Sequence, residues 1–275
     1  LRGFTSAPAR AFIAAMSSCC AAFDQAVTTI RRPWARSAAL AWCMRTSEPV
    51  VERPLESVDL PPDLDATEIA IWCGVPRGDP GAGVETLLSL DVLSPEERVR
   101  LGRFVHVDDR WSYAAAHAGL RLILGGMLGS APAALCFETG AQGKPSLPGG
   151  PFFSLSHTRG RVAVAVGQAP VGVDVETVRD LPDLAALATE AFAPETCAAL
   201  ERTSASARPA LFFRHWTLGE AFIKATGLGV SQGLQSFAFS AEGHPRLVRV
   251  TAGWGPPGAW QFGLHLPSAE ASSAG

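Results

Sequence analysis

Two kinds of apolar pattern alternate along the chain and predict both strands and helices. Short apolar or β-branched runs predict strands at 68–75, 152–155, 162–166, 171–175, 236–240, 246–250 and 259–266. Longer periodic segments predict helices at 95–104, 108–128, 184–191, 194–202 and 208–226. The first of these has a start signal, because Ser94 precedes Pro95 and Glu97 completes a capping box. The Gly- and Pro-rich stretch 76–84 predicts a loop.

The order of these elements predicts an α+β fold with two similar halves. Each half combines strands with helices, the first at 68–165 and the second at 166–266. Because no residue-level repeat is visible, this division depends on element order alone. We expect residues 1–67 to be a poorly structured or non-native N-terminal extension and 267–275 to be a tail.

The first fifty residues differ from the rest in charge. They hold six arginines and two acidic residues, whereas residues 51–275 hold 17 basic and 24 acidic residues. A targeting peptide would also be rich in arginine and poor in acids. Its apolar stretch, however, is interrupted by Ser17, Ser18, Cys19 and Cys20. We therefore favour the alternative that translation begins near Met44.

Composition narrows the class of protein. The 275 residues are 47% apolar and 18% charged, which is typical of a globular chain. A net charge of -3 argues against nucleic acid as a partner, and no apolar run is long enough for a membrane-spanning helix. Six cysteines without metal-ligand spacing are expected to be reduced, which predicts a cytoplasmic protein.

The first segment with candidate chemistry is GVDVE at 172–176. Asp174 and Glu176 are two residues apart in a predicted strand, so their carboxylates share one face. A divalent cation between them would relieve their repulsion, and an all-oxygen ligand set favours Mg²⁺ or Ca²⁺. Taken alone, the pair is more often the wet face of an edge strand.

The second segment is WTLGEAFIK at 216–224. Glu220 and Lys224 are four residues apart and lie on one helix face. An ordinary surface ion pair is the alternative, but the surrounding aromatic and aliphatic residues favour a partly buried helix. Lys224 is also one of only two lysines among 23 basic residues. Glu220 would supply a third carboxylate for a magnesium site.

The third segment, GKPSLPGGPFFSLSH at 143–157, contains the other lysine. Lys144 lies in a constrained turn, and Ser154 and Ser156 share one strand face while His157 points the other way. Ammonium, hydroxyl and imidazole groups can all donate to phosphate. The alternative for His157 is a satisfied core histidine. A nucleophilic serine is disfavoured because the G-x-S-x-G elbow is missing.

In this order and spacing, the three segments resemble the 4'-phosphopantetheinyl transferases. The similarity is to the larger, pseudo-dimeric kind that activates peptide, polyketide and fatty-acid synthases. It covers roughly residues 68–266 and includes LSPEERVRLGRF at 93–104. The resemblance implies a monomer in which two similar α+β halves form an intramolecular pseudo-dimer with the site between them.

The resemblance also implies an activity and a set of site residues. Members of the family move the 4'-phosphopantetheine arm of coenzyme A onto a serine of an acyl or peptidyl carrier protein and release 3',5'-ADP. It implies that Asp174, Glu176 and Glu220 are Mg²⁺ ligands, with Glu220 and Lys224 as the catalytic pair. The residues expected to contact coenzyme A are Lys144, Pro145, Ser156, His157, Arg100 and Arg103.

The sequence departs from the family pattern at two positions. Gly219 stands where the helix motif usually has a lysine, and Ser112 stands near an expected arginine that Arg110 or Arg121 could replace. The first departure motivates an alternative, a catalytically weakened module that binds coenzyme A or a carrier protein. A Mg²⁺-dependent phosphohydrolase is a third reading, which no phosphatase or P-loop motif supports. Because the carboxylates and Lys224 are retained, we expect an active enzyme.

Overall fold

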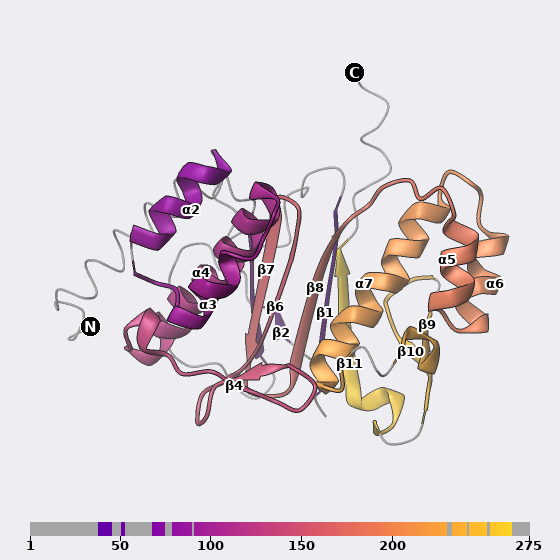
Figure 1. Ribbon diagram of the computed structural model, residues 1–275. Helices are drawn as coiled ribbons and strands as arrows, with labels where there is room; N and C mark the ends of the chain where they lie inside the picture. The colour runs from indigo at the N-terminus through magenta and orange to yellow at the C-terminus, as the bar shows by residue number, and fades with distance from the viewer. Residues whose placement is uncertain are drawn as a thin grey trace.

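The chain combines helices with small sheets, as the sequence predicts for the α+β class (Figure 1). The computed structural model describes residues 38–45, 51–52, 68–74, 79–89, 91–229, 233–240, 242–251 and 254–265. Figure 1 shows α2, α3 and α4 gathered on one side of the strands, and α5, α6 and α7 on the other. None of the helices in these residues is both long and apolar enough to cross a membrane.

One sheet has the strand order β2-β3-β7-β6. Its strands are β2 (Val51–Glu52), β3 (Glu68–Gly74), β7 (Arg161–Gly167) and β6 (Phe152–Thr158). The helix α4 (Val107–Leu128) packs on this sheet, where Leu120 and Leu124 meet Trp72 and Val164 in one apolar cluster. The helices α2 (Pro80–Ser89) and α3 (Pro95–Leu101) pack against α4 in a second apolar cluster.

A second sheet has the order β11-β1-β8. Its strands are β1 (Ala38–Arg45), β8 (Val171–Thr177) and β11 (Trp260–His265). The helix α7 (Arg208–Thr226) lies against it, and Phe222 in the C-terminal part of α7 is surrounded by aromatic rings that include Phe237, Trp260 and Phe262. The remaining elements of this side are α5 (Leu184–Ala191), α6 (Pro194–Arg202), η3 (Leu234–Ser236), β9 (Phe237–Phe239), β10 (Leu247–Val250) and η4 (Pro257–Ala259).

The two sheets meet where β6 and β7 lie beside β8. On the apolar side of β8, Val171, Val173 and Val175 pack with Ala163 and Ala165 of β7. On the polar side, side-chain hydroxyls of β6 accept hydrogen bonds from the β8 backbone. A short hairpin of β4 (Glu138–Thr139) and β5 (Pro145–Ser146) follows η1 (Pro132–Ala134) and precedes β6.

Two expectations from the sequence are wrong in the described residues. The stretch 76–84 is not all loop, because α2 begins at Pro80, where Asp79 Oδ1 accepts from Ala82 N at 2.8 Å. The N-terminal extension is not wholly unstructured, because β1 pairs with both β8 and β11. Strand pairing on both edges satisfies the β1 backbone. A start at Met44 would remove most of this strand, and the other N-terminal residues lie largely outside the described ranges.

Most other predicted elements are confirmed. The helices α5, α6 and α7 begin and end where the pattern predicts, and α3 has the predicted capping box. The division into two halves stays a prediction, and its boundary between 165 and 166 falls inside β7. Among the cysteines whose side chains the structure describes, Cys73, Cys136 and Cys197 are free. The cytoplasmic location and the monomeric state also stay predictions.

Candidate functional site

Two carboxylates of β8 face the helix α7. Gly172, Asp174 and Glu176 alternate along the strand and therefore share one face. A Cβ atom built on Gly172 would lie 1.9 Å from the Ala221 carbonyl oxygen of α7, so this face is the one that α7 covers. The glycine lets the helix backbone rest directly on the strand. Asp174, which is 4% exposed, is consequently buried beneath α7.

The helix α7 brings its own charged residues to the same place. Pro209 near its start and Gly227 at its end, with φ 74°, set its limits. Large buried side chains such as Phe222 fix its rotation. The ammonium of Lys224 then reaches Asp174 Oδ1 at 2.6 Å and Ser156 Oγ at 2.9 Å. Three segments that are distant in the sequence thus converge on one carboxylate.

The remaining two carboxyl groups belong to the same electrostatic cluster. Burial, followed by the Asp174 charge, raises the pKa of Glu176 to about 7. Burial and Asp174 likewise raise the pKa of Glu220, which Lys224 opposes. Three carboxyl groups and one ammonium share a half-buried space, so the cluster favours an added cation.

The cluster fits a hard divalent cation, although its groups are not gathered as ligands. No three His, Cys, Asp or Glu side chains in the described part of the chain are already arranged to hold a metal ion. Asp174 Oδ2, however, is buried and has no hydrogen-bond partner among the described residues. This orphaned oxygen and the all-oxygen donor set match what Mg²⁺ takes in proteins. The predicted set of Asp174, Glu176 and Glu220 is therefore chemically suitable.

His157 lies on the other face of β6, as the alternation predicts. Its ring meets Tyr113 of α4 edge-on, with the centroids 6.1 Å apart. Burial, with His117 and Lys224 as further causes, lowers the pKa of His157 to about 4. The imidazole is therefore neutral at pH 7 and can still donate one hydrogen bond.

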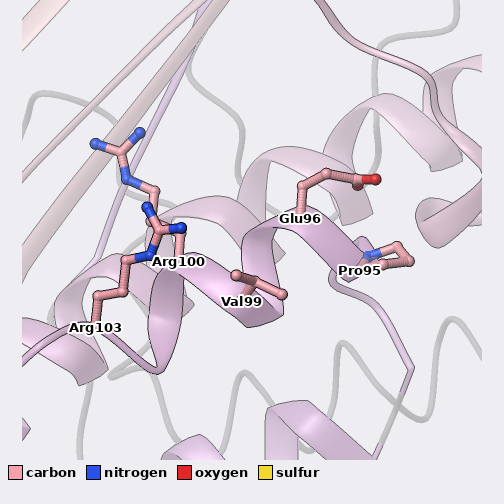
Figure 2. Close-up of a pocket in the computed structure, with 5 residues that line it drawn as sticks. All are labelled: Pro95, Glu96, Val99, Arg100 and Arg103. Atoms are coloured by element: carbon pink, nitrogen blue, oxygen red, sulfur yellow. The ribbon is translucent and has the colours of Figure 1, made fainter.

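Arg100 and Arg103 line a surface pocket on α3, together with Pro95, Glu96 and Val99 (Figure 2). Figure 2 shows both guanidinium groups on the same side of the helix. Arg100 also lies over the Tyr113 ring, with its Cζ atom 5.7 Å from the centroid. Tyr113 therefore connects Arg100 to His157, a link that the sequence does not reveal.

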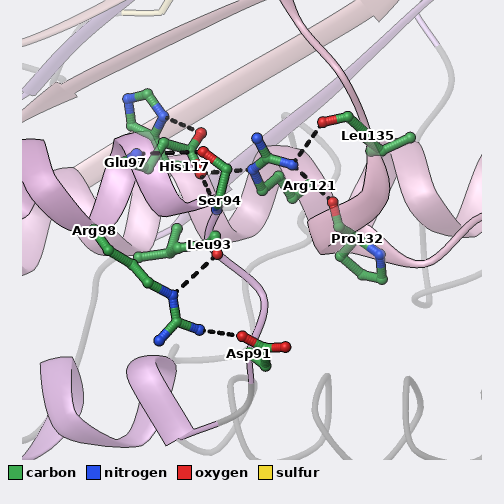
Figure 3. A network of polar contacts seen from close by, with 9 residues as sticks. All are labelled: Asp91, Leu93, Ser94, Glu97, Arg98, His117, Arg121, Pro132 and Leu135. Carbon is green, nitrogen blue, oxygen red and sulfur yellow. Dashed lines mark hydrogen bonds and ion pairs between the residues drawn. The ribbon is translucent and has the colours of Figure 1, made fainter.

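A buried network holds α3 in place (Figure 3). Glu97 closes the capping box with Ser94 and also accepts from Arg121 Nε at 2.6 Å, while its other oxygen lies 2.9 Å from His117 Nδ1. Burial opposes ionisation of Glu97, but these hydrogen bonds prevail and lower its pKa. Arg121 donates further to the carbonyls of Pro132 and Leu135. It is thus committed to structure and cannot replace the arginine expected near position 112.

Lys144 and Pro145 lie apart from the carboxylate cluster. Lys144 Nζ donates to the carbonyl of Val171 at 3.1 Å and to that of Ala225 at 3.3 Å. These contacts tie the β4–β5 hairpin to the start of β8 and to the last turn of α7. A cation at a helix C-terminus is also favourable toward the helix dipole.

Gly219 faces away from the cluster. A Cβ atom at this position would lie 2.4 Å from Leu234 Cδ2 and 3.3 Å from Phe237 Cε2. The glycine therefore has a packing role, because α7 lies close to η3 and β9 there. The sequence alone suggested a lost charge at the site, which this placement does not support.

Three residues near the site have contacts that the sequence does not reveal. Tyr113 is hidden in the alanine-rich helix α4, and Ser154, which the sequence offers only as a possible donor to phosphate, accepts from the β8 backbone. Gly172 is part of the GVDVE motif, but its role depends on how closely α7 approaches. Only the tertiary arrangement gives each of them a function.

The sequence of this chain is similar to those of known proteins. A family model described as the 4'-phosphopantetheinyl transferase superfamily matches residues 170–272. The 4'-phosphopantetheinyl transferase HetI of Nostoc sp. is 33% identical over 180 residues, which are 62% of this chain and 75% of HetI. The 4'-phosphopantetheinyl transferase psf-1 of Bacillus pumilus is 36% identical over 53% of this chain and 62% of its own length. For the 4'-phosphopantetheinyl transferase Sfp of Bacillus subtilis, the identity is 27% over 54% of this chain and 66% of Sfp. With three quarters of HetI covered at this identity, the chain belongs to the 4'-phosphopantetheinyl transferase superfamily.

Proposed function

We propose that this chain transfers the 4'-phosphopantetheine arm of coenzyme A to a serine of an acyl or peptidyl carrier protein in a Mg²⁺-dependent reaction. The observation that carries the proposal is the convergence of Asp174, Lys224 and Ser156 at distances of 2.6 to 2.9 Å, beside two carboxyl groups of raised pKa. Phosphoryl-type transfer needs positioning and charge neutralisation more than covalent chemistry. A cluster of carboxylates with one ammonium suits that need.

Asp174, Glu176 and Glu220 are the proposed holders of Mg²⁺. Asp174 offers the unpartnered oxygen Oδ2, and a bound cation would favour the ionised form of the other two carboxyl groups, whose pKa values burial and Asp174 raise. When bound, Mg²⁺ would neutralise charge on the pyrophosphate of coenzyme A.

The catalytic roles fall to Glu220 and Lys224. In the reaction, the carrier serine oxygen bonds to the phosphorus of the pantetheine arm. The bond from that phosphorus to the bridging oxygen breaks, and its electron pair leaves with 3',5'-ADP. Glu220, whose pKa burial and Asp174 raise, takes the serine proton directly or through a water. Lys224 lies one helical turn away and stabilises the negative charge on the reacting phosphate.

Coenzyme A would bind where the two sheets meet. His157, Arg100 and Arg103 provide donors and positive charge on the α3–α4 side, and Lys144 provides an ammonium from the hairpin, where Pro145 would offer only an apolar contact. We further propose that the two sides act as halves of an intramolecular pseudo-dimer, so that a monomer forms the whole site. The contacts of β6 and β7 with β8 support this arrangement.

Mass spectrometry of an apo carrier protein tests the proposal. The full chain, coenzyme A and Mg²⁺ should add about 340 Da to the carrier, the mass of the phosphopantetheine arm joined through its phosphate. Asp174→Ala should abolish the gain, whereas Asp180→Ala, which removes an exposed carboxylate three residues past β8, should not. Substantial Mg²⁺-dependent transfer by Asp174→Ala would refute the ligand assignment.

The same assay separates the other functions. Release of 3',5'-ADP without a carrier protein would indicate a phosphohydrolase. Coenzyme A binding without transfer to any of several carriers would indicate a binding module. The binding module was suggested by Gly219 in place of an expected lysine, and the packing role of this glycine removes that reason.

A further inference from the structure

We infer that Ser156 is a positioning residue, which fixes the Asp174 carboxylate and the Lys224 ammonium relative to each other and does not contact coenzyme A. The inference rests on the proposed function, since it concerns the same reaction. It also departs from the role that the family resemblance implies for this serine.

The hydrogen-bonding capacity of Ser156 is already used in full. A serine hydroxyl has one donor and two acceptor positions. Ser156 Oγ lies 2.8 Å from Asp174 Oδ1, accepts from Lys224 Nζ at 2.9 Å and accepts from Val175 N at 3.4 Å. An ammonium and a backbone N–H can only donate, so the hydroxyl proton must point to the carboxylate. A phosphate oxygen needs a donor, and Ser156, 7% exposed, has none to offer.

The bonds of Ser156 determine which Asp174 oxygen stays available. Oδ1 accepts from both Ser156 and Lys224, and Oδ2 has no partner among the described residues. The terminal torsion of aspartate is broad, so a carboxylate held by one long lysine side chain alone could turn. Ser156 comes from the rigid strand β6 and prevents that rotation. It thereby keeps Oδ2 directed to the proposed cation site.

Ser154 provides a matched control on the same strand. It lies two residues before Ser156 on the same face, and its Oγ accepts from Val173 N of β8 at 3.1 Å. Both serines therefore join β6 to the β8 backbone in the same way. The structure gives Ser154 Oγ no hydrogen bond to a carboxylate or an ammonium within the described residues. Comparing Ser154→Ala with Ser156→Ala therefore separates the role of joining β6 to β8 from the role of positioning Asp174 and Lys224.

The experiment compares Ser156→Ala and Ser154→Ala in the full chain by two readouts. The first is the dissociation constant of coenzyme A, measured by calorimetry in EDTA without a carrier protein. The second is the rate of carrier loading as a function of Mg²⁺ concentration. We expect Ser156→Ala to bind coenzyme A within about twofold of wild type. Its kcat should fall about 10- to 100-fold and its half-saturating Mg²⁺ should rise about tenfold, the usual cost of losing a ligand-orienting partner.

Two outcomes would overturn the inference. A tenfold or larger rise in the metal-free dissociation constant of coenzyme A would make Ser156 a substrate contact. An equal loss of kcat in Ser156→Ala and Ser154→Ala would leave only the joining role. If Ser156→Ala unfolds, Ser156→Cys keeps the side-chain volume with only weak hydrogen bonding and takes its place. A wild-type chain that loads no carrier would instead refute the proposed function, and the inference with it.

Discussion

The close contact of α7 with β8 leads to the sharpest prediction, which concerns Gly172→Ala. The added Cβ would lie 1.9 Å from the Ala221 carbonyl oxygen and 2.5 Å from Ala225 N. Both neighbours are backbone atoms of α7, so no side-chain rotation can make room. A carbon–oxygen contact needs about 3.3 Å, so the helix must retreat by more than about 1 Å.

That displacement has a cost in stability and a larger one in activity. Overpacking of a core usually costs about 1–3 kcal/mol, and rigid neighbours place this variant near about 3 kcal/mol. For a chain of this size, the melting temperature should fall by roughly 6 to 12 °C. Lys224 and Glu220 move with α7, away from Asp174. A misplacement of about 1 Å in a catalytic arrangement can reduce the rate about 100-fold.

Thermal unfolding and carrier loading of Gly172→Ala check these values, with Gly119→Ala as the control. Gly119 lies within α4, and a Cβ there would meet nothing within 4 Å. Replacing a helical glycine with alanine should therefore stabilise the protein by up to about 1 kcal/mol and leave the transfer rate unchanged. If Gly172→Ala matched wild type in both assays, the direct contact of α7 with β8 could not be correct.

Two further variants test a buried histidine and a buried ion pair. His215 is 2% exposed, and burial, then Arg214, lowers its pKa to about 4. As the pH falls, this histidine therefore takes up its proton in the unfolded chain before it does so in the folded chain. The contribution of neutral His215 to the free energy of unfolding is fully present above about pH 6.5. It declines toward pH 4, by at most about 1.4 kcal/mol per pH unit. His215→Leu should make that decline shallower in urea titrations at several pH values, and an unchanged slope would contradict the burial argument. Arg121→Met should cost about 3–5 kcal/mol, because it leaves Glu97 buried without its guanidinium partner. Adding Glu97→Gln should recover part of this loss in denaturant unfolding, and a single-variant cost below about 1 kcal/mol would show that the ion pair is dispensable.

The sequence predicts the local elements well where the residues that start and end a helix agree with its hydrophobic periodicity. The helix α3 has Ser94 and Glu97 as its capping box, and α7 has Pro209 at its start and Gly227 at its end. The helix α2 breaks this rule, since Gly81 and Gly83 are poor helix formers. It forms because Val84 and Leu87 pack against α4. Tertiary packing overrides local propensity there, and a single sequence does not reveal it.

The site residues follow the same division between local and long-range information. Spacing along one element correctly predicts the shared face of Asp174 and Glu176, and that of Glu220 and Lys224. The bond of Lys224 to Ser156 spans 68 residues, and no spacing rule reaches so far. Neither the joint between β6 and β8 nor the insertion of β1 beside β8 could be predicted, because both depend on which strand edges meet.

Gly219 shows why matching a motif letter by letter can mislead on a helix. Neighbouring helical residues point about 100° apart, so positions 219 and 220 serve different faces of α7. Glu220 shares the face of Lys224, toward β8, whereas Gly219 meets Leu234 and Phe237. A longer side chain at 219 would first have to displace Leu234, which is buried. The glycine and the leucine are therefore one packing solution. The glycine at 219 affects how closely η3 and β9 approach α7. It does not alter the charge of the carboxylate cluster.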